Sequence, residues 1–190
     1  SLTGDFSGNS AEYGGVLRSA SVTGDVSLTG NFTNNNATSF GGVLYSNGDV
    51  VGNVSLVGNF TGNTARNGGV ANVGNAVSGS VSLTGDFSGN SAQWGGVLRT
   101  GSVNGDVILT GNFTNNTATN NGGVFLAEGS EVSGNVSLTG NFTRNTAKTN
   151  GGVFHAFSPV SGNVGLTGDF SGNAADRGGV LSTFSEFSGN

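Results

Sequence analysis

The 190-residue chain contains no cysteine, no methionine and only one proline, and 9% of its residues are charged. The lack of cysteine excludes a disulfide framework and a thiolate zinc site. Six Lys and Arg oppose eleven Asp and Glu, for a formal net charge of −5. The cations are scattered, so nucleic acid is a poor candidate partner, because a phosphate backbone is neutralised by clustered cations.

Two further absences concern how the chain is placed in the cell. No stretch reaches the roughly 20 consecutive apolar residues of a membrane span, so we expect no span in this segment. The sequence also shows no signal peptide, and Ser1 falls inside a repeat rather than at a start methionine. We therefore expect the chain to be a piece of a longer protein.

Glycine, in contrast, is abundant, with 37 residues, and such a bias indicates either disorder or repetition. Repetition explains it, since a leucine recurs at nearly even spacing along the chain: Leu2, Leu28, Leu56, Leu83, Leu109, Leu138 and Leu166. A period of roughly 26–29 residues is typical of solenoid repeats. It predicts one array over residues 1–190, with seven coils that begin near residues 1, 27, 55, 82, 108, 137 and 165.

Two more rows keep a fixed distance from this leucine. A phenylalanine lies four residues after it in every copy: Phe6, Phe32, Phe60, Phe87, Phe113, Phe142 and Phe170. An asparagine lies three residues further on: Asn9, Asn35, Asn63, Asn90, Asn116, Asn145 and Asn173. We expect the phenylalanines to stack, and the asparagines to form a buried ladder whose amides bond from coil to coil. A polar binding row is the functional alternative for the asparagines.

The residues around the leucine read Val-x-Leu-x-Gly-x-Phe, with Ser, Thr, Asp or Asn mostly between them. Alternation of period two is typical of a strand with one buried face, and the glycine content argues against a helix. One coil cannot bury its own apolar row, but stacked coils can. The sequence thus predicts an all-β fold, a parallel β-solenoid without terminal caps, and the crossover rule favours a right-handed β-helix.

After the asparagine each copy continues with Ala and then Gly-Gly-Val, and the residue after that valine is also apolar. Alternation cannot turn two adjacent residues inward. We expect a bulge at the paired glycines to rotate one of them, and the alternative is an exposed apolar stripe.

Acidic residues share their repeat positions with asparagine. Asp5, Asp86 and Asp169 occupy one such position, at intervals of three coils, and Asp25 and Asp106 another, while Asp49 lies close to the latter in its coil. This exchange favours turn chemistry, because a calcium-loaded repeat would need a carboxylate in every coil. We expect no metal and no other cofactor.

The sequence offers no set of residues for catalysis. The single histidine, His155, has no nucleophile and carboxylate around it, and its repeat position also accepts Arg, Tyr, Asn, Leu and Ser. We interpret this position as a tolerant surface site, and the chain as no enzyme. Aromatic residues stand just before Gly-Gly at Tyr13, Phe40 and Trp94, where other copies carry Asn or Arg. These three are candidate surface contacts, and the alternative role is a lid over one corner of the solenoid.

The repeat Phe87-Ser88-Gly89-Asn90-Ser91-Ala92, followed by Gly95-Gly96-Val97-Leu98, resembles the repeats of chlamydial polymorphic outer-membrane proteins. That family carries Phe-x-x-Asn and Gly-Gly-Ala-[Ile/Leu/Val] motifs in a β-helical passenger that an autotransporter barrel exports, and it is associated with adhesion to host cells. The resemblance covers all seven copies, with valine here in place of the alanine of the second motif. It implies an extracellular or cell-surface location.

Three functions fit these observations. The first is a structural part of an extracellular bacterial fibre, filament or surface stalk. The second is an adhesin passenger that contacts a host or neighbouring cell. The third, minor one is ice binding by the outward hydroxyl row of residues such as Thr29, which Val57 and Asp86 interrupt. For a fibre we expect self-association, laterally or end to end, since Ser188-Gly189-Asn190 matches the approach to a new coil at Ser161-Gly162-Asn163.

Overall fold

The Val-x-Leu-x-Gly-x-Phe segments form a seven-stranded parallel sheet, here called the wide sheet, in a computed structural model that describes residues 1–189. Its strands are stacked in chain order: β1 (Leu2–Ser7), β5 (Val26–Thr33), β9 (Val54–Thr61), β11 (Val81–Ser88), β14 (Val107–Thr114), β17 (Val136–Thr143) and β20 (Val164–Asp169). Equivalent residues pair in register, as Leu28 with Leu56 and Phe32 with Phe60. The expected match at Asn190 lies outside the described residues.

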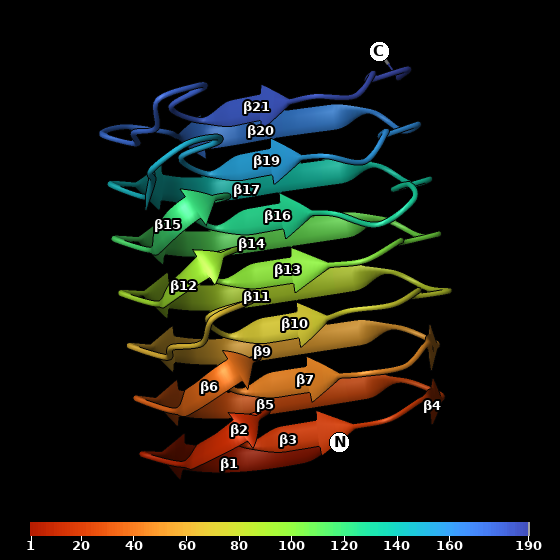
Figure 1. The fold of residues 1–190 in the computed structure, drawn as a ribbon, viewed down its shortest axis with the longest axis vertical. Helices are drawn as coiled ribbons and strands as arrows, with labels where there is room; N and C mark the ends of the chain where they lie inside the picture. Colours follow the sequence, from red (N-terminus) through yellow and green to blue (C-terminus); the bar gives the residue numbers. More distant parts are fainter. Residues whose placement is uncertain (190) are drawn as a thin grey trace.

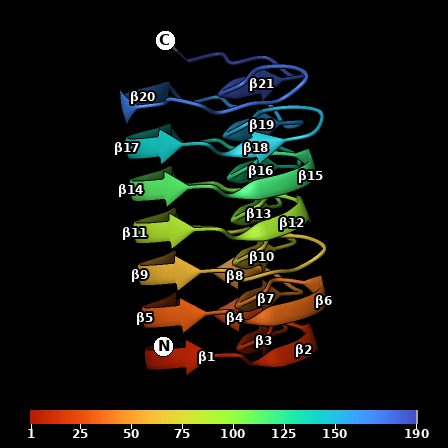
Figure 2. The same cartoon turned by 90° about the vertical axis from the view of Figure 1, so that its left-hand side faces the viewer.

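The segments after Gly-Gly-Val form a second seven-stranded parallel sheet, the narrow sheet. Its strands are β3 (Leu17–Ser19), β7 (Leu44–Ser46), β10 (Ala71–Val73), β13 (Leu98–Thr100), β16 (Phe125–Ala127), β19 (Phe154–Ala156) and β21 (Leu181–Thr183). The two sheets lie on opposite sides of the molecule (Figure 2). Each coil therefore contributes one long and one short strand to a two-sided core.

Shorter pairings join the sheets on either side. The corner after the wide sheet holds β2 (Ser10–Tyr13), β6 (Asn36–Phe40), β12 (Ser91–Trp94), β15 (Thr117–Asn121) and β18 (Thr146–Ala147). The opposite turn holds β4 (Val22–Thr23) and β8 (Val50–Val51), and its pairing continues as single parallel bridges from Val50 through Val77 and Val103. In Figure 1 the chain climbs from N to C with the front strands running rightward and the rear strands leftward, a right-handed winding. Residues 1–189 contain no helix that could cross a membrane.

The core is a set of continuous rows. Interior Val, Leu and Phe side chains of the wide sheet are fully buried, as are the valines of the opposite turn. That valine row was not predicted from the sequence, although the signal was present, since each valine lies six residues before the next repeat leucine, as Val50 does before Leu56. In the end coils the same rows are less covered, and Leu166 is 40% exposed. The fold class, an all-β parallel solenoid of seven coils, agrees with the sequence prediction.

The backbone at Gly-Gly-Val forms neither the bulge at the paired glycines nor the exposed apolar stripe that the sequence suggested. Val43 and Leu44 are both fully buried, so no exposed apolar stripe exists at this step. The ladder irregularity lies earlier, between Ala92 and Trp94 in the fourth copy. At the glycines the backbone instead bends, with Gly41 in the left-handed region at φ 62°. The bend points two adjacent side chains into the core, because it breaks the alternation that a straight strand imposes.

Glycine in the middle of the wide strands is required by coil stacking. Gly85 has φ +129°, and a Cβ built on it would lie 2.2 Å from the carbonyl oxygen of Gly58 in the preceding coil. The same close approach recurs along the row, for example from Gly111 to Gly85. Only a residue without a side chain allows this backbone contact.

Candidate functional site

The row of asparagines forms a hydrogen-bonded ladder inside the corner that follows the wide sheet. Asn63 donates from Nδ2 to Oδ1 of Asn90 (3.1 Å) and to the carbonyl oxygen of Phe32 (2.8 Å), and its backbone N–H also donates to Oδ1 of Asn90 (2.9 Å). Asn63 is fully buried. Each interior rung thus uses both amide protons and both lone pairs of the amide oxygen. The rungs are Asn9, Asn35, Asn63, Asn90, Asn116, Asn145 and Asn173.

The phenylalanines form a second ladder next to the asparagines. The rings of Phe60 and Phe87 stack with centroids 4.7 Å apart and planes 1° apart. The two end pairs are slightly wider, at 5.1 Å for Phe6 with Phe32 and 5.0 Å for Phe142 with Phe170. The ring spacing therefore reports the rise of one coil, which is the usual distance between paired strands.

A shorter ladder runs over the outer side of the wide sheet. Asn31 donates from Nδ2 to Oδ1 of Asp5 (2.7 Å), and Asn59 donates to Oδ1 of Asn31 (2.8 Å). The pattern starts again three coils later with Asp86, Asn112 and Asn141. A carboxylate has no proton to pass on, so each aspartate ends one ladder. This explains the three-coil superperiod as an Asp-Asn-Asn unit.

The turn role expected for Asp5, Asp86 and Asp169 is wrong, because these residues lie within β1, β11 and β20. Asp25 and Asp106 do lie at a turn, where each accepts a hydrogen bond from a backbone N–H of the next coil.

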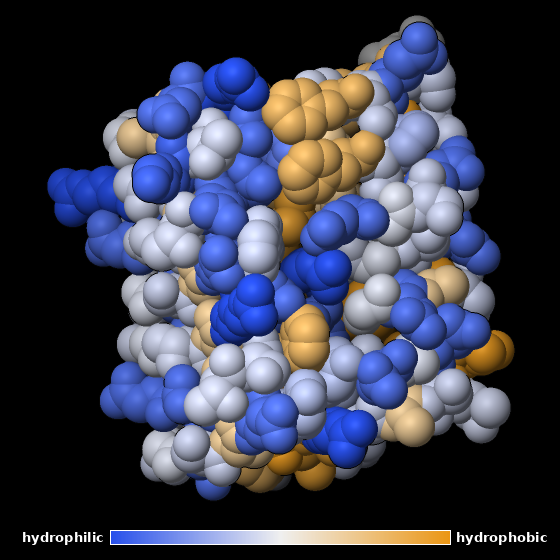
Figure 3. Space-filling model, viewed as in Figure 1, coloured by the Kyte–Doolittle hydropathy of each residue, from blue (hydrophilic) through white to orange (hydrophobic). Residues whose placement is uncertain are grey.

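The copies differ most on the outer side of the narrow sheet, here called the variable face. One row lies on the sheet itself: Arg18, Tyr45, Asn72, Arg99, Leu126, His155 and Ser182. The other lies along the adjoining corner: Tyr13, Phe40, Asn67, Trp94, Asn121, Asn150 and Arg177. Figure 3 shows this side, where hydrophilic side chains predominate and a hydrophobic patch lies in the upper part of the view. Because the side chains of the variable face differ between coils while the backbone that carries them is constant, this face is the candidate functional surface.

The three aromatic candidates divide between two places on the variable face. Tyr13 and Phe40 stack on each other and both contact Tyr45, with centroids 5.1 to 5.8 Å apart. The guanidinium of Arg18 lies 5.3 Å from the Tyr13 ring, and a hydrogen bond to Glu12 raises the pKa of Tyr13. Tyr13 and Phe40 are half-buried and Tyr45 is buried, so the cluster is part of the solenoid wall and two of its rings are also accessible.

Trp94 stands apart from that cluster, two coils further along. The guanidinium of Arg66 lies 5.7 Å from its ring and donates to Oε1 of Gln93 (3.2 Å). The indole N–H reaches Oδ1 of Asn120 at 3.3 Å, with the Asn120 amide turned so that its nitrogen donates to Thr119. Arg66 is exposed, so its charge faces solvent.

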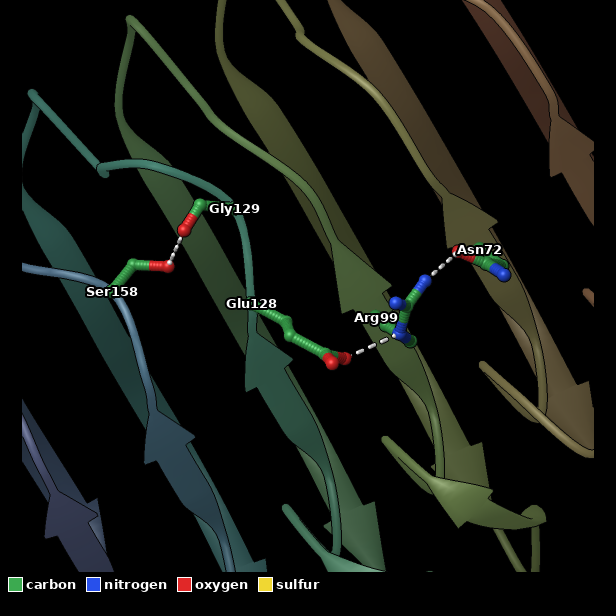
Figure 4. Close-up of polar contacts among 5 residues, drawn as sticks. All are labelled: Asn72, Arg99, Glu128, Gly129 and Ser158. Carbon is green, nitrogen blue, oxygen red and sulfur yellow. Dashed lines mark hydrogen bonds and ion pairs between the residues drawn. The ribbon is translucent and has the colours of Figure 1, made fainter.

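Arg99 crosses three coils of the variable face, as Figure 4 shows. Its Nε donates to Glu128 at 2.8 Å, and its Nη1 donates to Oδ1 of Asn72 at 3.2 Å. This is the one salt bridge among residues 1–189. Sequence reasoning missed Arg18, Tyr45, Arg66 and Arg99. The signal was present, since Arg18, Tyr45 and Arg99 share the repeat position that was interpreted as merely tolerant.

The surface interpretation of His155 is wrong. The side chain is fully buried, edge-on to the rings of Phe157 and Phe184 at 4.4 and 5.0 Å. Its Nδ1 lies 3.1 Å from the carbonyl oxygen of Ser182, so Nδ1 carries the proton, and Nε2 has no partner. Burial lowers the pKa of this histidine. Phe157 of the same coil and Phe184 of the next coil cover this side chain. An alignment of the repeats does not reveal their contact with it.

Catalysis or metal binding requires several ionisable side chains that face a common cavity. The described residues enclose no pocket, and they gather no cluster of three or more His, Asp or Glu side chains. Compared with protein-family models, curated proteins and solved structures, the chain matches none of them significantly.

Proposed function

We propose that this chain is a structural, non-catalytic segment of an extracellular bacterial fibre, filament or surface stalk. The observation that carries the proposal is the continuity of its ladders. The Asn and Phe rows repeat the same contacts at every interior coil, so each added coil extends the rod by one 4.7 Å step with no new chemistry. Such a repeat suits a long, stiff rod, because every added coil makes the same contacts.

The absence of catalysis is part of the proposal. Its support is that the lone histidine is packed between rings and that the aspartates of the wide sheet accept hydrogen bonds from asparagine. These groups serve the fold. Neither nucleic acid nor a metal enters the proposal, in keeping with the acidic, low-charge composition.

Placement outside the cell rests on the resemblance of the Phe-x-x-Asn and Gly-Gly-Val repeats to those of chlamydial polymorphic outer-membrane proteins. Immunogold electron microscopy of the source cells, with antibodies against this chain, tests the proposal. We expect label along thin, unbranched surface filaments, and loss of the protein after protease treatment of intact cells. Protease-resistant label confined to the cell interior would contradict it.

Adhesion is the second candidate, and the variable face favours it. Tyr, Trp and Arg are the residues that most often dominate protein contacts, and here they occur together on one side. Beads coated with the chain should then bind host or neighbouring cells, and beads coated with a Tyr13→Asn, Trp94→Asn variant should not. Equal binding of the two would remove this candidate.

A further inference from the structure

Trp94 interrupts a ladder that the rest of its row could form. Asn150 donates from Nδ2 to Oδ1 of Asn121 at 2.8 Å, so asparagines at this position bond from coil to coil. Trp94 lies between Asn67 and Asn121 in the same row. An asparagine there would continue the ladder downward to Asn67.

The interruption leaves a buried group without a partner. Asn67 is 8% exposed, and its Oδ1 has no hydrogen bond. A buried acceptor without a donor is unfavourable. The same loss occurs at Asn150, whose Oδ1 is unpaired next to Arg177, so a residue other than asparagine in this row costs the asparagine of the preceding coil a hydrogen bond. Trp94 makes contacts of its own, with Arg66 and Asn120, but it breaks the hydrogen-bonded row, and positions that break the local rule are where function is expected.

The two cations beside these aromatics form no ion pair with residues 1–189. Arg66 bonds only to the neutral Gln93 and the Trp94 ring, and Arg18 lies on the Tyr13 ring without an ion pair among residues 1–189. Both guanidinium groups are therefore available to carboxylates of another molecule, and a second copy of this chain, with a net charge of −5, carries such carboxylates.

The wide sheet of the same chain presents the complementary groups. Its outward side carries the exposed carboxylates of Asp5 and Asp86, and between their coils lies Val57, which is 38% exposed. Val57 pairs with Thr84, two residues from Asp86, so an apolar group and a carboxylate are neighbours there. The acids also recur at the interval of the aromatics, since Asp5 and Asp86 are separated by the same length of chain, three coils, as Tyr13 and Trp94.

We propose that the variable face, centred on Trp94 and Arg66, binds the wide-sheet face of a second copy of this chain, so that solenoids pack side by side. Trp94 then contacts Val57 of the neighbour, and Arg66 pairs with Asp86. The shared three-coil interval lets Arg18 and Tyr13 meet Asp5 of the neighbour in the same register, because both copies have the same rise per coil. This inference rests on the proposed fibre role, because the fibre brings several copies of the chain close together.

The available surface is sufficient for such contact. A stable interface takes about 800 Å² from each partner. That is about a ninth of the 7219 Å² surface of the chain, and each sheet spans all seven coils. Because the two contacting faces differ, the association is heterologous and leaves one face free on each outer copy.

Sedimentation velocity on the purified chain, from about 1 μM to about 1 mM, tests the proposal. We expect concentration-dependent association that high salt weakens. Trp94→Asn should weaken it about thirtyfold, as loss of a central interface aromatic does, without lowering the melting temperature, because it completes the Asn row. Val57→Thr combined with Asp86→Asn should have a similar effect, since both replacements are residues that other coils carry at these positions.

Mixing these two variants is the decisive step. Each retains one intact face, so an equimolar mixture should form a one-to-one dimer at concentrations where each variant alone is monomeric. Arg144→Gln, which removes a cation outside the variable face, is the matched control and should associate like the original chain.

Three outcomes overturn the inference: a monomer at all concentrations, association that Trp94→Asn leaves unchanged, or no dimer in the mixture. The second would indicate contact through the coil ends, and the first would leave the variable face to a foreign protein. None of them bears on whether the protein forms surface filaments, which the cell microscopy decides separately.

Discussion

Asparagine can be buried in this solenoid because its amide carries two protons and two lone pairs in a geometry that matches the coil spacing. At Asn90 one amide proton goes to Asn116 and the other to the carbonyl oxygen of Phe60. Its oxygen accepts from the backbone and side chain of Asn63. No other side chain of this size satisfies all four groups.

Asn90→Asp removes two donors and buries a charge. We expect a loss of about 3 kcal/mol or more in the free energy of unfolding, measured by urea denaturation at neutral pH. Burial raises the pKa of the introduced carboxyl, so the loss should shrink as the pH falls and the folded protein takes up the proton. Asn104→Asp, at an exposed turn, is the control and should change stability little. Equal stability of the two variants would show that the ladder is not buried.

His155 predicts a pH dependence of its own. Burial lowers its folded pKa below the ordinary value, so the folded state binds the proton less readily than the unfolded state. Stability should be complete at pH values above the unfolded pKa and fall as the pH drops through the folded pKa. His155→Leu should remove this loss, because Leu126 fills the paired position in the preceding coil while fully buried. Urea denaturation at neutral and mildly acidic pH, with and without the substitution, measures it. An unchanged acid loss in the variant would place the titrating group elsewhere.

At the scale of single elements, the wide strands depend on backbone contact between coils. Gly85→Ala would place a methyl group 2.2 Å from a carbonyl oxygen and hold a side chain at φ +129°. We expect a loss of at least about 2 kcal/mol, from strain together with disruption of the ladder. Gly165→Ala is the control, since nothing lies within 4 Å of its added Cβ and its φ is not in the left-handed region. Thermal unfolding of both variants measures the difference, and a harmless Gly85→Ala would mean that the coils lie further apart.

The elements could be predicted from the sequence where they repeat strictly. Val-x-Leu-x-Gly-x-Phe has one length in all copies, so both its strand and its register follow from the period. The bend at Gly41-Gly42 could not be predicted, because a bulge and a left-handed glycine give the same sequence signal. Nor could the burial of His155, since the rings of Phe157 and Phe184 that cover it belong to no strict row.

At the scale of the whole molecule, coils of unequal length stay in phase because the length differences fall outside the two large sheets. One lies in the corner strands, as the ladder irregularity between Ala92 and Trp94, and the other lies in the turn before the next wide strand. The extra residues are accommodated there, while the two sheets and the asparagine ladder keep a common rise. The candidate surface follows from this division. The wide sheet stays uniform because it sets the stack, and the variable face is free to diverge between copies.

The central claim is that consecutive coils stack in parallel and in register, and the lack of cysteine allows a direct test. A Thr84→Cys, Thr110→Cys double variant joins two paired positions of neighbouring coils on the exposed side of the wide sheet. Their separation is close to the strand spacing and suits a disulfide, whereas Thr84→Cys with Thr139→Cys spans two coils and does not. Mass spectrometry after mild oxidation of monomeric protein should find an intramolecular disulfide in the first variant and free thiols in the second. Similar oxidation of both, or of the second alone, would contradict the stacked and in-register solenoid.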